Sequence, residues 1–149
     1  MTPPVYMRAA VYRRYGPPEV VSVGDVLTPV PGPTDLLVRV RATTVTSADW
    51  RIRSLTVPRG FGFLSRLAFG ITAPRQPILG SELAGDVVAL GASVTNFAVG
   101  DAVVASAGTK LGAHAEYCCI AADGVVVHKP AHLAYESAAA LPFGGTTAL

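Results

Sequence analysis

The hydrophobic pattern alternates most clearly over Leu36–Val45. Val38 and Val40 share one face of this segment, whereas Arg39 and Arg41 occupy the other. Successive side chains of a strand point to opposite faces of a sheet. The segment is therefore predicted to be a half-buried strand, with its valine face in the core and its arginine face in solvent.

Other short apolar runs bounded by glycine and proline predict further strands. They are expected at Met7–Arg13, Val20–Leu27, Asp86–Leu90, Ala102–Ala105, Ala113–Ala121 and Val125–Lys129. Gly91 is expected to reverse the chain after the third of these runs, and Gly100 is free to take a positive φ before the fourth. The pattern thus predicts a mainly β protein.

Three segments favour short helices instead. Ser47–Ser54 has helical character, and Ser47 is a plausible N-cap. A short amphipathic helix is expected near Leu64–Phe69 in the otherwise irregular stretch 51–76, which is interpreted either as a plain loop or as a substrate-pocket lid. The alanine-rich Tyr135–Leu141 is expected to be helical until Pro142.

The stretch from Pro77 to Ala105 contains the spacing G-x-E-x-x-G … G-x-x-V … G-D-x-V. This spacing resembles the medium-chain dehydrogenase/reductase superfamily, in the GroES-like catalytic domain of alcohol dehydrogenases and quinone oxidoreductases. The start of the chain, with Y-G-x-P-E-V and P-x-P-G-P, is similar to the same family, so the resemblance covers essentially the whole sequence. It implies a mainly β fold with short helices, a GroES-like partly open β-barrel.

The end of the chain resembles the family segment L-P-x-x-x-x-T-A that leads into a nucleotide-binding domain. The resemblance therefore divides the chain into a GroES-like catalytic domain, residues 1–133, and the start of a connecting helical segment, residues 134–149. A dinucleotide-binding turn of the form G-x-G-x-x-G does not occur in the sequence. The chain is interpreted as the catalytic half of a longer enzyme, or as the product of a gene truncated at this point, without the Rossmann domain.

Composition narrows the class of protein. Half of the residues are apolar and 15% are charged, which disfavours disorder. No apolar run approaches the roughly 18 residues of a membrane span, and the first residues lack the apolar core of a signal peptide. A cytoplasmic protein without membrane contact is expected.

Charge is unevenly distributed along the chain. Residues 1–76 carry +6, including ten arginines, and residues 77–149 carry −4. Such asymmetry is found in proteins that bind anions or nucleic acid, but also where arginines only solvate an outer face. A nucleic-acid interface is disfavoured because the chain lacks exposed aromatics interleaved on strands and any known module.

The cysteines and histidines favour structural roles. Cys118 and Cys119 are adjacent, and on a strand they would point to opposite faces, so reduced thiols are expected rather than a disulfide or a shared metal. His114, His128 and His132 lack a second ligand at metal-binding spacing. They are interpreted as surface or hydrogen-bonded structural residues.

The resemblance also indicates where a metal would be bound. Zinc-dependent members of the family use a Cys in C-x-x-D and a His in G-H-E-x-x-G, and Thr46 and Ser81 stand at these two positions here. Neither hydroxyl is a competent Zn²⁺ ligand at neutral pH. Asp49, which would orient a metal-bound histidine, is retained. The sequence therefore resembles the zinc-independent quinone oxidoreductase and enoyl reductase branch, and no metal site is expected.

Within that branch the resemblance assigns three candidate site residues. Thr46 and Ser81 are the catalytic candidates, because both would line the nicotinamide pocket. Thr46 is interpreted either as a hydrogen-bond donor to the substrate carbonyl or as a residue that only satisfies local backbone groups. Thr147 is the candidate cofactor contact. Glu82, without a metal nearby, is expected to be structural, with Arg51 or Arg53 as its partner.

The implied activity is hydride transfer from NADPH (or NADH) to a quinone, an enone or another carbonyl-activated small molecule. The cofactor would be bound mainly by the missing domain, so this chain alone is expected to be inactive, and a homodimer is possible for the full-length form. The alternative is a non-catalytic GroES-like module that binds a partner.

Overall fold

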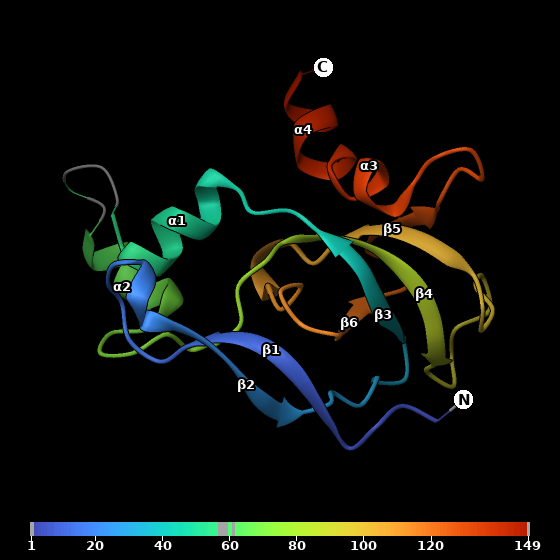
Figure 1. Cartoon of the computed structure of the whole chain (residues 1–149), viewed down its shortest axis with the longest axis horizontal. Coiled ribbons are helices and arrows are strands. Elements are labelled where there is room, and N and C mark those ends of the chain that lie inside the picture. Colours follow the sequence, from blue (N-terminus) through green and yellow to red (C-terminus); the bar gives the residue numbers. More distant parts are fainter. Residues whose placement is uncertain (1, 57–59, 61, 149) are drawn as a thin grey trace.

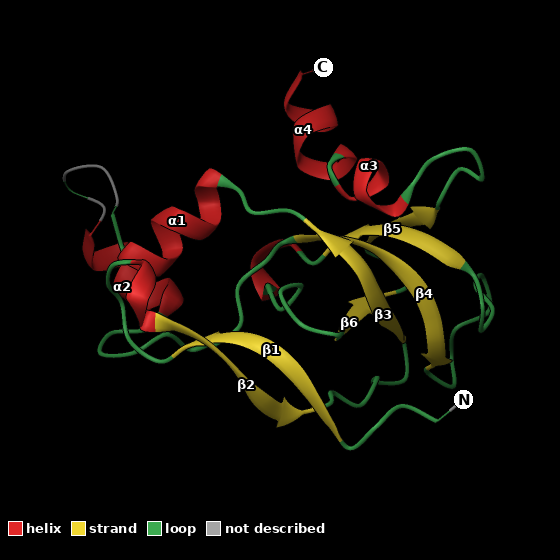
Figure 2. Ribbon diagram, in the orientation of Figure 1, coloured by secondary structure: helices red, strands yellow, loops and turns green. Residues whose placement is uncertain are grey.

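A computed structural model of the chain describes residues 2–56, 60 and 62–148. Its strands form a two-stranded hairpin and a five-stranded antiparallel sheet of order β6-β3-β4-β5-β7, which curls into a partly open barrel (Figures 1 and 2). The strands are β1 (Tyr6–Tyr12), β2 (Val21–Leu27), β3 (Asp35–Thr43), β4 (Glu82–Leu90), β5 (Ala102–Ser106), β6 (Tyr117–Ala121) and β7 (Val125–His128). The predicted mainly β fold with a partly open barrel is confirmed.

The central pair β3–β4 forms the core of the sheet, as the alternation predicts. Val38 is fully buried and Val40 packs against the same core cluster, whereas Arg39 and Arg41 are exposed. Leu83 and Val87 of β4 are buried in that cluster. Burying a side chain of this size stabilises the fold by about 1.5–3 kcal/mol, so this pair anchors the barrel.

The hairpin β1–β2 closes the barrel by contacts with distant segments. Ala9 forms an isolated β-bridge with Ala115, and Val11 forms one with Ile78. Met7, Ala9, Val11 and Ile78 make a second buried cluster at this junction. The amino-terminal hairpin is thus held by residues that lie far along the chain.

Helices lie at two ends of the barrel (Figure 1). On one side are α1 (Ser47–Ser54) and α2 (Gly62–Phe69), and on the other are α3 (Tyr135–Ala139) and α4 (Leu141–Ala148). Two 3₁₀ turns, η1 (Pro18–Val20) and η2 (Gly108–Lys110), connect strands. In α3, Ala138 and Ala139 are buried against Ala84 and Val104 of the sheet. The predicted boundary between residues 133 and 134 stays a prediction.

Two strand predictions were wrong in detail. β4 begins at Glu82 rather than Asp86, and it runs through Gly85, where a Cβ would lie 2.1 Å from the carbonyl oxygen of Arg39. Only a glycine permits this close strand pairing. The strand expected from Ala113 starts at Tyr117, because the residues before it make bridge and turn contacts with Ala9 and Leu79 instead.

Helix termini account for the other differences. Thr46, not Ser47, is the N-cap of α1: its backbone is extended, and the Asp49 side chain accepts its N–H. Pro142 does not end a helix but lies in the first turn of α4, where a missing N–H costs nothing. In the stretch 51–76, residues 57–59 and 61 lie outside the described part, and the question of lid or loop stays open there.

Candidate functional site

A cleft of about 380 Å³ lies between the helices at the mouth of the barrel. Its walls come from α1, from the segment around η2 and from α4, and its floor is the start of β4. Most of the lining is apolar, with a few hydroxyl groups. The residues that the argument uses are Ile52, Phe69, Ser81, Glu82, Thr109 and Thr146. Such a mix of apolar walls and few polar groups is typical of small-molecule sites.

Asp49 holds the two sides of the cleft together. Its Oδ2 accepts hydrogen bonds from the backbone N–H (2.7 Å) and the hydroxyl (2.9 Å) of Thr46, and its Oδ1 accepts one from the backbone N–H of Gly80 (2.9 Å). The carboxylate is 3% exposed. A buried carboxylate with three donors is well compensated for its loss of water. Asp49 therefore fixes the start of α1 against the segment that leads into β4.

Gly80 directs the chain into the cleft floor. Its φ is +92°, and a Cβ at this position would lie 2.5 Å from a ring carbon of His114 and 2.7 Å from its backbone nitrogen. Both the conformation and the space require glycine. The next two residues, Ser81 and Glu82, are thereby placed in the lining of the cleft.

Glu82 is buried, with 2% of its surface exposed. Its Oε2 accepts a hydrogen bond from the hydroxyl of Thr44 (2.7 Å), and its Oε1 has no hydrogen-bond partner among the described residues. The expected partner was Arg51 or Arg53, and this was wrong. Arg53 instead donates to the backbone carbonyl of Gly16 at 2.5 Å, because α1 directs its side chain away from β4.

The three sequence-predicted site residues have different surroundings. Ser81 lies in the cleft, half-buried, and the structure records no hydrogen bond from its hydroxyl to any described residue. The hydroxyl of Thr46 already donates to Asp49, and Thr46 does not line the cleft. Thr147 is exposed on α4 and donates to the carbonyl of Phe143 (2.6 Å). The structure therefore brings only Ser81 to the cleft lining, and the assigned roles stay predictions.

Two threonines of the site were missed by sequence reasoning. Thr44 is the partner of Glu82, and Thr146 rather than its neighbour lines the cleft. Thr44 lies next to the end of a predicted strand, where a hydroxyl can reach the adjacent strand. For Thr146 the signal is weaker, since neighbouring residues of a helix face about 100° apart and only the packing of α4 decides which one faces inward.

The donor set near Thr46 does not fit a zinc ion. Both oxygens of Asp49 are occupied by hydrogen bonds, and hydroxyl groups stand at the positions of the thiolate and imidazole ligands. Within residues 2–56, 60 and 62–148 the structure contains no group of three or more His, Cys, Asp or Glu side chains arranged to bind a metal.

Comparison with known proteins identifies the domain. Residues 32–131 match the family model of the alcohol dehydrogenase GroES-like domain. The chain belongs to this family. It is 37% identical over 137 residues to a quinone oxidoreductase of Pseudomonas aeruginosa, covering 91% of this chain and 37% of that protein.

Solved structures of the medium-chain dehydrogenase/reductase superfamily agree with this GroES-like fold. The quinone oxidoreductase from Coxiella burnetii superposes with a TM-score of 0.83 at 31% identity, covering 96% of this chain and 43% of that one. A mycobacterial protein in complex with NADPH superposes with a TM-score of 0.75 at 31% identity, covering 95% and 39%. The chain spans about two fifths of the length of these relatives.

The two cysteines and the histidines lie outside the cleft lining. Burial raises the pKa of Cys118 to about 12 and that of Cys119 to about 11, and both thiols are free. His114 Nε2 is 2.9 Å from the carbonyl oxygen of Thr44, and His128 pairs with Asp101 at 3.0 Å. Both cysteines are free, and these two histidines have hydrogen-bond partners; their structural roles stay predictions. None of the described helices has the length and apolar character needed to cross a bilayer.

Proposed function

We propose that this chain is the catalytic-domain portion of an NAD(P)H-dependent, zinc-independent oxidoreductase that reduces quinones, enones or similar carbonyl-activated molecules. The single observation that carries the proposal is the cleft: apolar walls and a half-buried serine hydroxyl with no recorded partner, at the position of a family metal ligand. The relatives named quinone oxidoreductases support the same chemistry.

The cleft fits flat, weakly polar rings. Ile52 and Phe69 provide apolar walls that exclude water, and Ser81, Thr109 and Thr146 provide hydroxyls near the same space. NAD(P)H, when bound, supplies the hydride. This chain's own part is to hold the substrate against the cofactor, with the Ser81 hydroxyl donating to the substrate carbonyl oxygen as negative charge develops there.

The residues that replace the metal ligands, Thr46 and Ser81, support the proposed zinc independence. Asp49 bonds to Thr46 and Gly80, so it is occupied as a structural group. The function of Thr46 in this proposal is to position α1 rather than to touch substrate. Thr147, on α4, is proposed to contact the cofactor, and NADPH is preferred over NADH on the likeness to the mycobacterial NADPH complex.

The first test is NADPH binding, measured by fluorescence titration on this chain and on a form extended through the downstream reading frame. We expect tight binding and quinone reduction only in the extended form. In that form Ser81→Ala should lower kcat by about ten-fold or more, as loss of one aimed hydrogen-bond donor does. Ser137→Ala, an exposed serine on α3, is the matched control and should leave kcat unchanged. Equal activity of the two variants would remove Ser81 from the mechanism.

A non-catalytic binding module is the second candidate. It is favoured by exposed apolar side chains on α2 and α4, among them Phe63 at 78% and Phe143 at 47%. Apolar surface of this kind often marks an interface. If the reading frame ends at residue 149 and the chain binds neither NADPH nor zinc, this second function is the correct one.

We also propose a cytoplasmic location and a homodimer of the full-length form. Cell fractionation tests the location, and light scattering tests the oligomeric state.

A further inference from the structure

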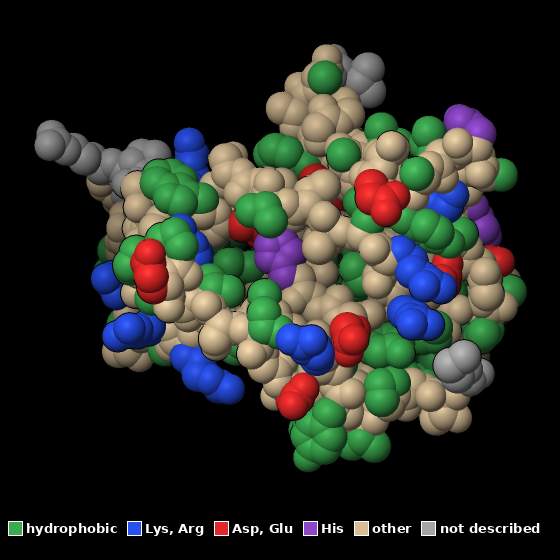
Figure 3. Space-filling view, viewed as in Figure 1, with side chains coloured by type: hydrophobic (Ala, Val, Ile, Leu, Met, Phe, Trp, Pro, Cys, Tyr) green, Lys and Arg blue, Asp and Glu red, His purple; other side chains and the backbone are tan. Residues whose placement is uncertain are grey.

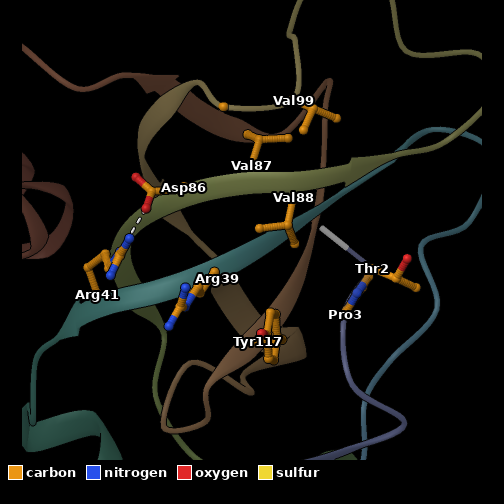
Figure 4. Close-up of a pocket in the computed structure, with 10 residues that line it drawn as sticks. Thr2, Pro3, Arg39, Arg41, Asp86, Val87, Val88, Val99 and Tyr117 are labelled. Carbon is orange, nitrogen blue, oxygen red and sulfur yellow. Dashed lines mark hydrogen bonds and ion pairs between the residues drawn. The ribbon is translucent and has the colours of Figure 1, made fainter.

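A second cavity lies on the outer face of the sheet, away from the cleft. It measures about 390 Å³ and is formed by β3, β4, β6 and the amino-terminal residues (Figure 4). None of the residues that line it lines the cleft. The residues that the argument uses are Pro3, Arg39, Arg41, Asp86, Val88, Val99 and Tyr117.

A cross-strand row builds the floor of this outer pocket. Arg39 of β3 is paired in register with Asp86 of β4 on one side and with Tyr117 of β6 on the other. Directly opposed residues of neighbouring strands present their side chains on the same face. The β3–β4 register shifts between Val40 and Ala42, and Arg41 lies at this irregularity. Arg41 also lines the pocket, so two guanidinium groups face one hollow.

The two arginines differ in their partners. Arg41 Nε donates to Asp86 Oδ2 at 2.7 Å, and the Tyr135 hydroxyl donates to Asp86 Oδ1 at 2.5 Å, so both carboxylate oxygens are occupied. The guanidinium of Arg39 has no recorded hydrogen bond or ion pair with any described residue, and Figure 4 shows it between Arg41 and Tyr117. Two cations and one anion leave the pocket with one uncompensated positive charge. Figure 3 shows Lys and Arg side chains over β3 and β4, and others on the side of α1, α2 and the β1–β2 hairpin.

The other walls are apolar. Val88, Val99, Pro3 and the ring of Tyr117 line the same hollow. A volume of about 390 Å³ is within the range of small-molecule sites. The pocket therefore combines a free, planar guanidinium fork, suited to a carboxylate, with walls suited to a hydrocarbon body.

We propose that this outer pocket binds a small monocarboxylate with an apolar body, such as a medium-chain fatty acid, with its carboxylate on Arg39. One negative charge on the ligand matches the one uncompensated positive charge. The hydrocarbon body then covers Val88 and Val99. The site is separate from the cleft, so its occupant is not a substrate of the proposed reduction.

Octanoate binding to this chain, followed by calorimetry and by amide chemical shifts, tests the proposal. We expect octanoate to bind and to shift the amides of Val88, Val99 and Tyr117 rather than those of Ser81 and Thr109. Octanamide keeps the hydrocarbon but lacks the charge, and acetate keeps the charge but lacks the hydrocarbon. Each should bind at least about ten-fold more weakly, because each loses one of the two contributions.

Variants test the assignment to Arg39. Arg39→Gln should weaken octanoate binding by about ten-fold or more, since a charge-assisted pair is lost, whereas Arg13→Gln, at an exposed arginine elsewhere, should not change it. Asp86→Asn removes the anion beside Arg41 and should tighten binding. The proposal is overturned if octanoate does not bind, if octanamide binds as tightly, if the shifts fall in the cleft, or if Arg39→Gln has no effect. Inorganic phosphate binding as tightly as octanoate would show a plain anion site and overturn the role of the apolar walls.

Discussion

The junction of β3 with α1 and the floor of the cleft each contain one buried carboxylate, and the two are satisfied very differently. At the junction, Asp49 accepts three hydrogen bonds from two segments. On the floor, Glu82 accepts one, and its second oxygen has no partner among the described residues. Equal burial therefore serves opposite purposes. The first carboxylate stabilises the fold, and the second leaves an acceptor unpaired beside the proposed substrate space.

The largest expected effect comes from breaking the junction. Asp49→Ala leaves the backbone N–H of Gly80 and both donors of Thr46 without an acceptor. We expect a loss of about 3 kcal/mol in the free energy of unfolding, measured by urea denaturation. Asp49→Asn, of the same shape but with one acceptor oxygen, should lose less. A loss below about 1 kcal/mol for Asp49→Ala would show that water replaces the carboxylate without cost.

Removing the partner of Glu82 should have the next largest effect. Thr44→Val deletes the hydroxyl that donates to Oε2 and leaves the buried carboxylate without a donor. We expect a loss of about 1–2 kcal/mol in unfolding free energy, against no change for Thr95→Val, an exposed threonine. In the Glu82→Gln background the same substitution should cost less. An equal cost in both backgrounds would mean that Thr44 acts through packing alone.

Neutralising Glu82 itself should change stability little. Glu82→Gln removes a charge that has one donor, so the loss of that interaction is offset by a lower cost of burial. We expect a change within about 1 kcal/mol, far below that of Asp49→Ala. The same urea experiment measures both. A Glu82→Gln protein as unstable as Asp49→Ala would contradict the comparison, since it would make both carboxylates structural.

Asp86, a third carboxylate that lies nearer the surface, is expected to have the smallest effect on stability when it is replaced. Burial opposes ionisation of Asp86, but hydrogen bonds from Tyr135 and Arg41 outweigh it and lower its pKa. A pKa lower in the folded than in the unfolded state adds stability above the unfolded value of about 4, and this stability is lost as pH falls through the folded pKa. When the melting temperature is measured against pH, its decrease toward acid pH should therefore be less steep in Asp86→Asn than in the unchanged protein. An unchanged decrease would assign the acid sensitivity to other groups.

The strands could be predicted because their signals are local, whereas the GroES-like barrel was implied by the family resemblance. The alternation of Val38 and Val40 with Arg39 and Arg41 depends only on the two-residue period of a strand, and the structure follows it. The errors arose where distant contacts decide. Glu82–Gly85 joins β4 because Gly85 lies against the backbone of β3, and that pairing cannot be inferred from the glycine alone.

The site was less predictable for the same reason. The family motif predicts that Ser81 lines the nicotinamide pocket. The structure puts Ser81 in the lining of the cleft, and its role there stays a prediction. The partner of Glu82 was expected to be an arginine of the nearby helix, because a buried carboxylate is commonly paired with a positively charged side chain. The donor is instead the hydroxyl of Thr44, which reaches Glu82 across the sheet, whereas Arg53 points toward Gly16. Only the geometry of the β3–β4 pair distinguishes these partners.

The β-bridges that close the barrel can form only after distant parts of the chain have been synthesised. The hairpin β1–β2 leaves the ribosome first, but its docking partners at Ile78 and Ala115 follow much later. Until they emerge, the apolar faces of Met7, Ala9 and Val11 can pack only on Val26 of the same hairpin. Contacts between residues so distant in sequence slow folding and prolong the exposure of apolar surface that can aggregate. The nascent hairpin is thus expected to expose part of its apolar face until Ile78 and Ala115 have been synthesised.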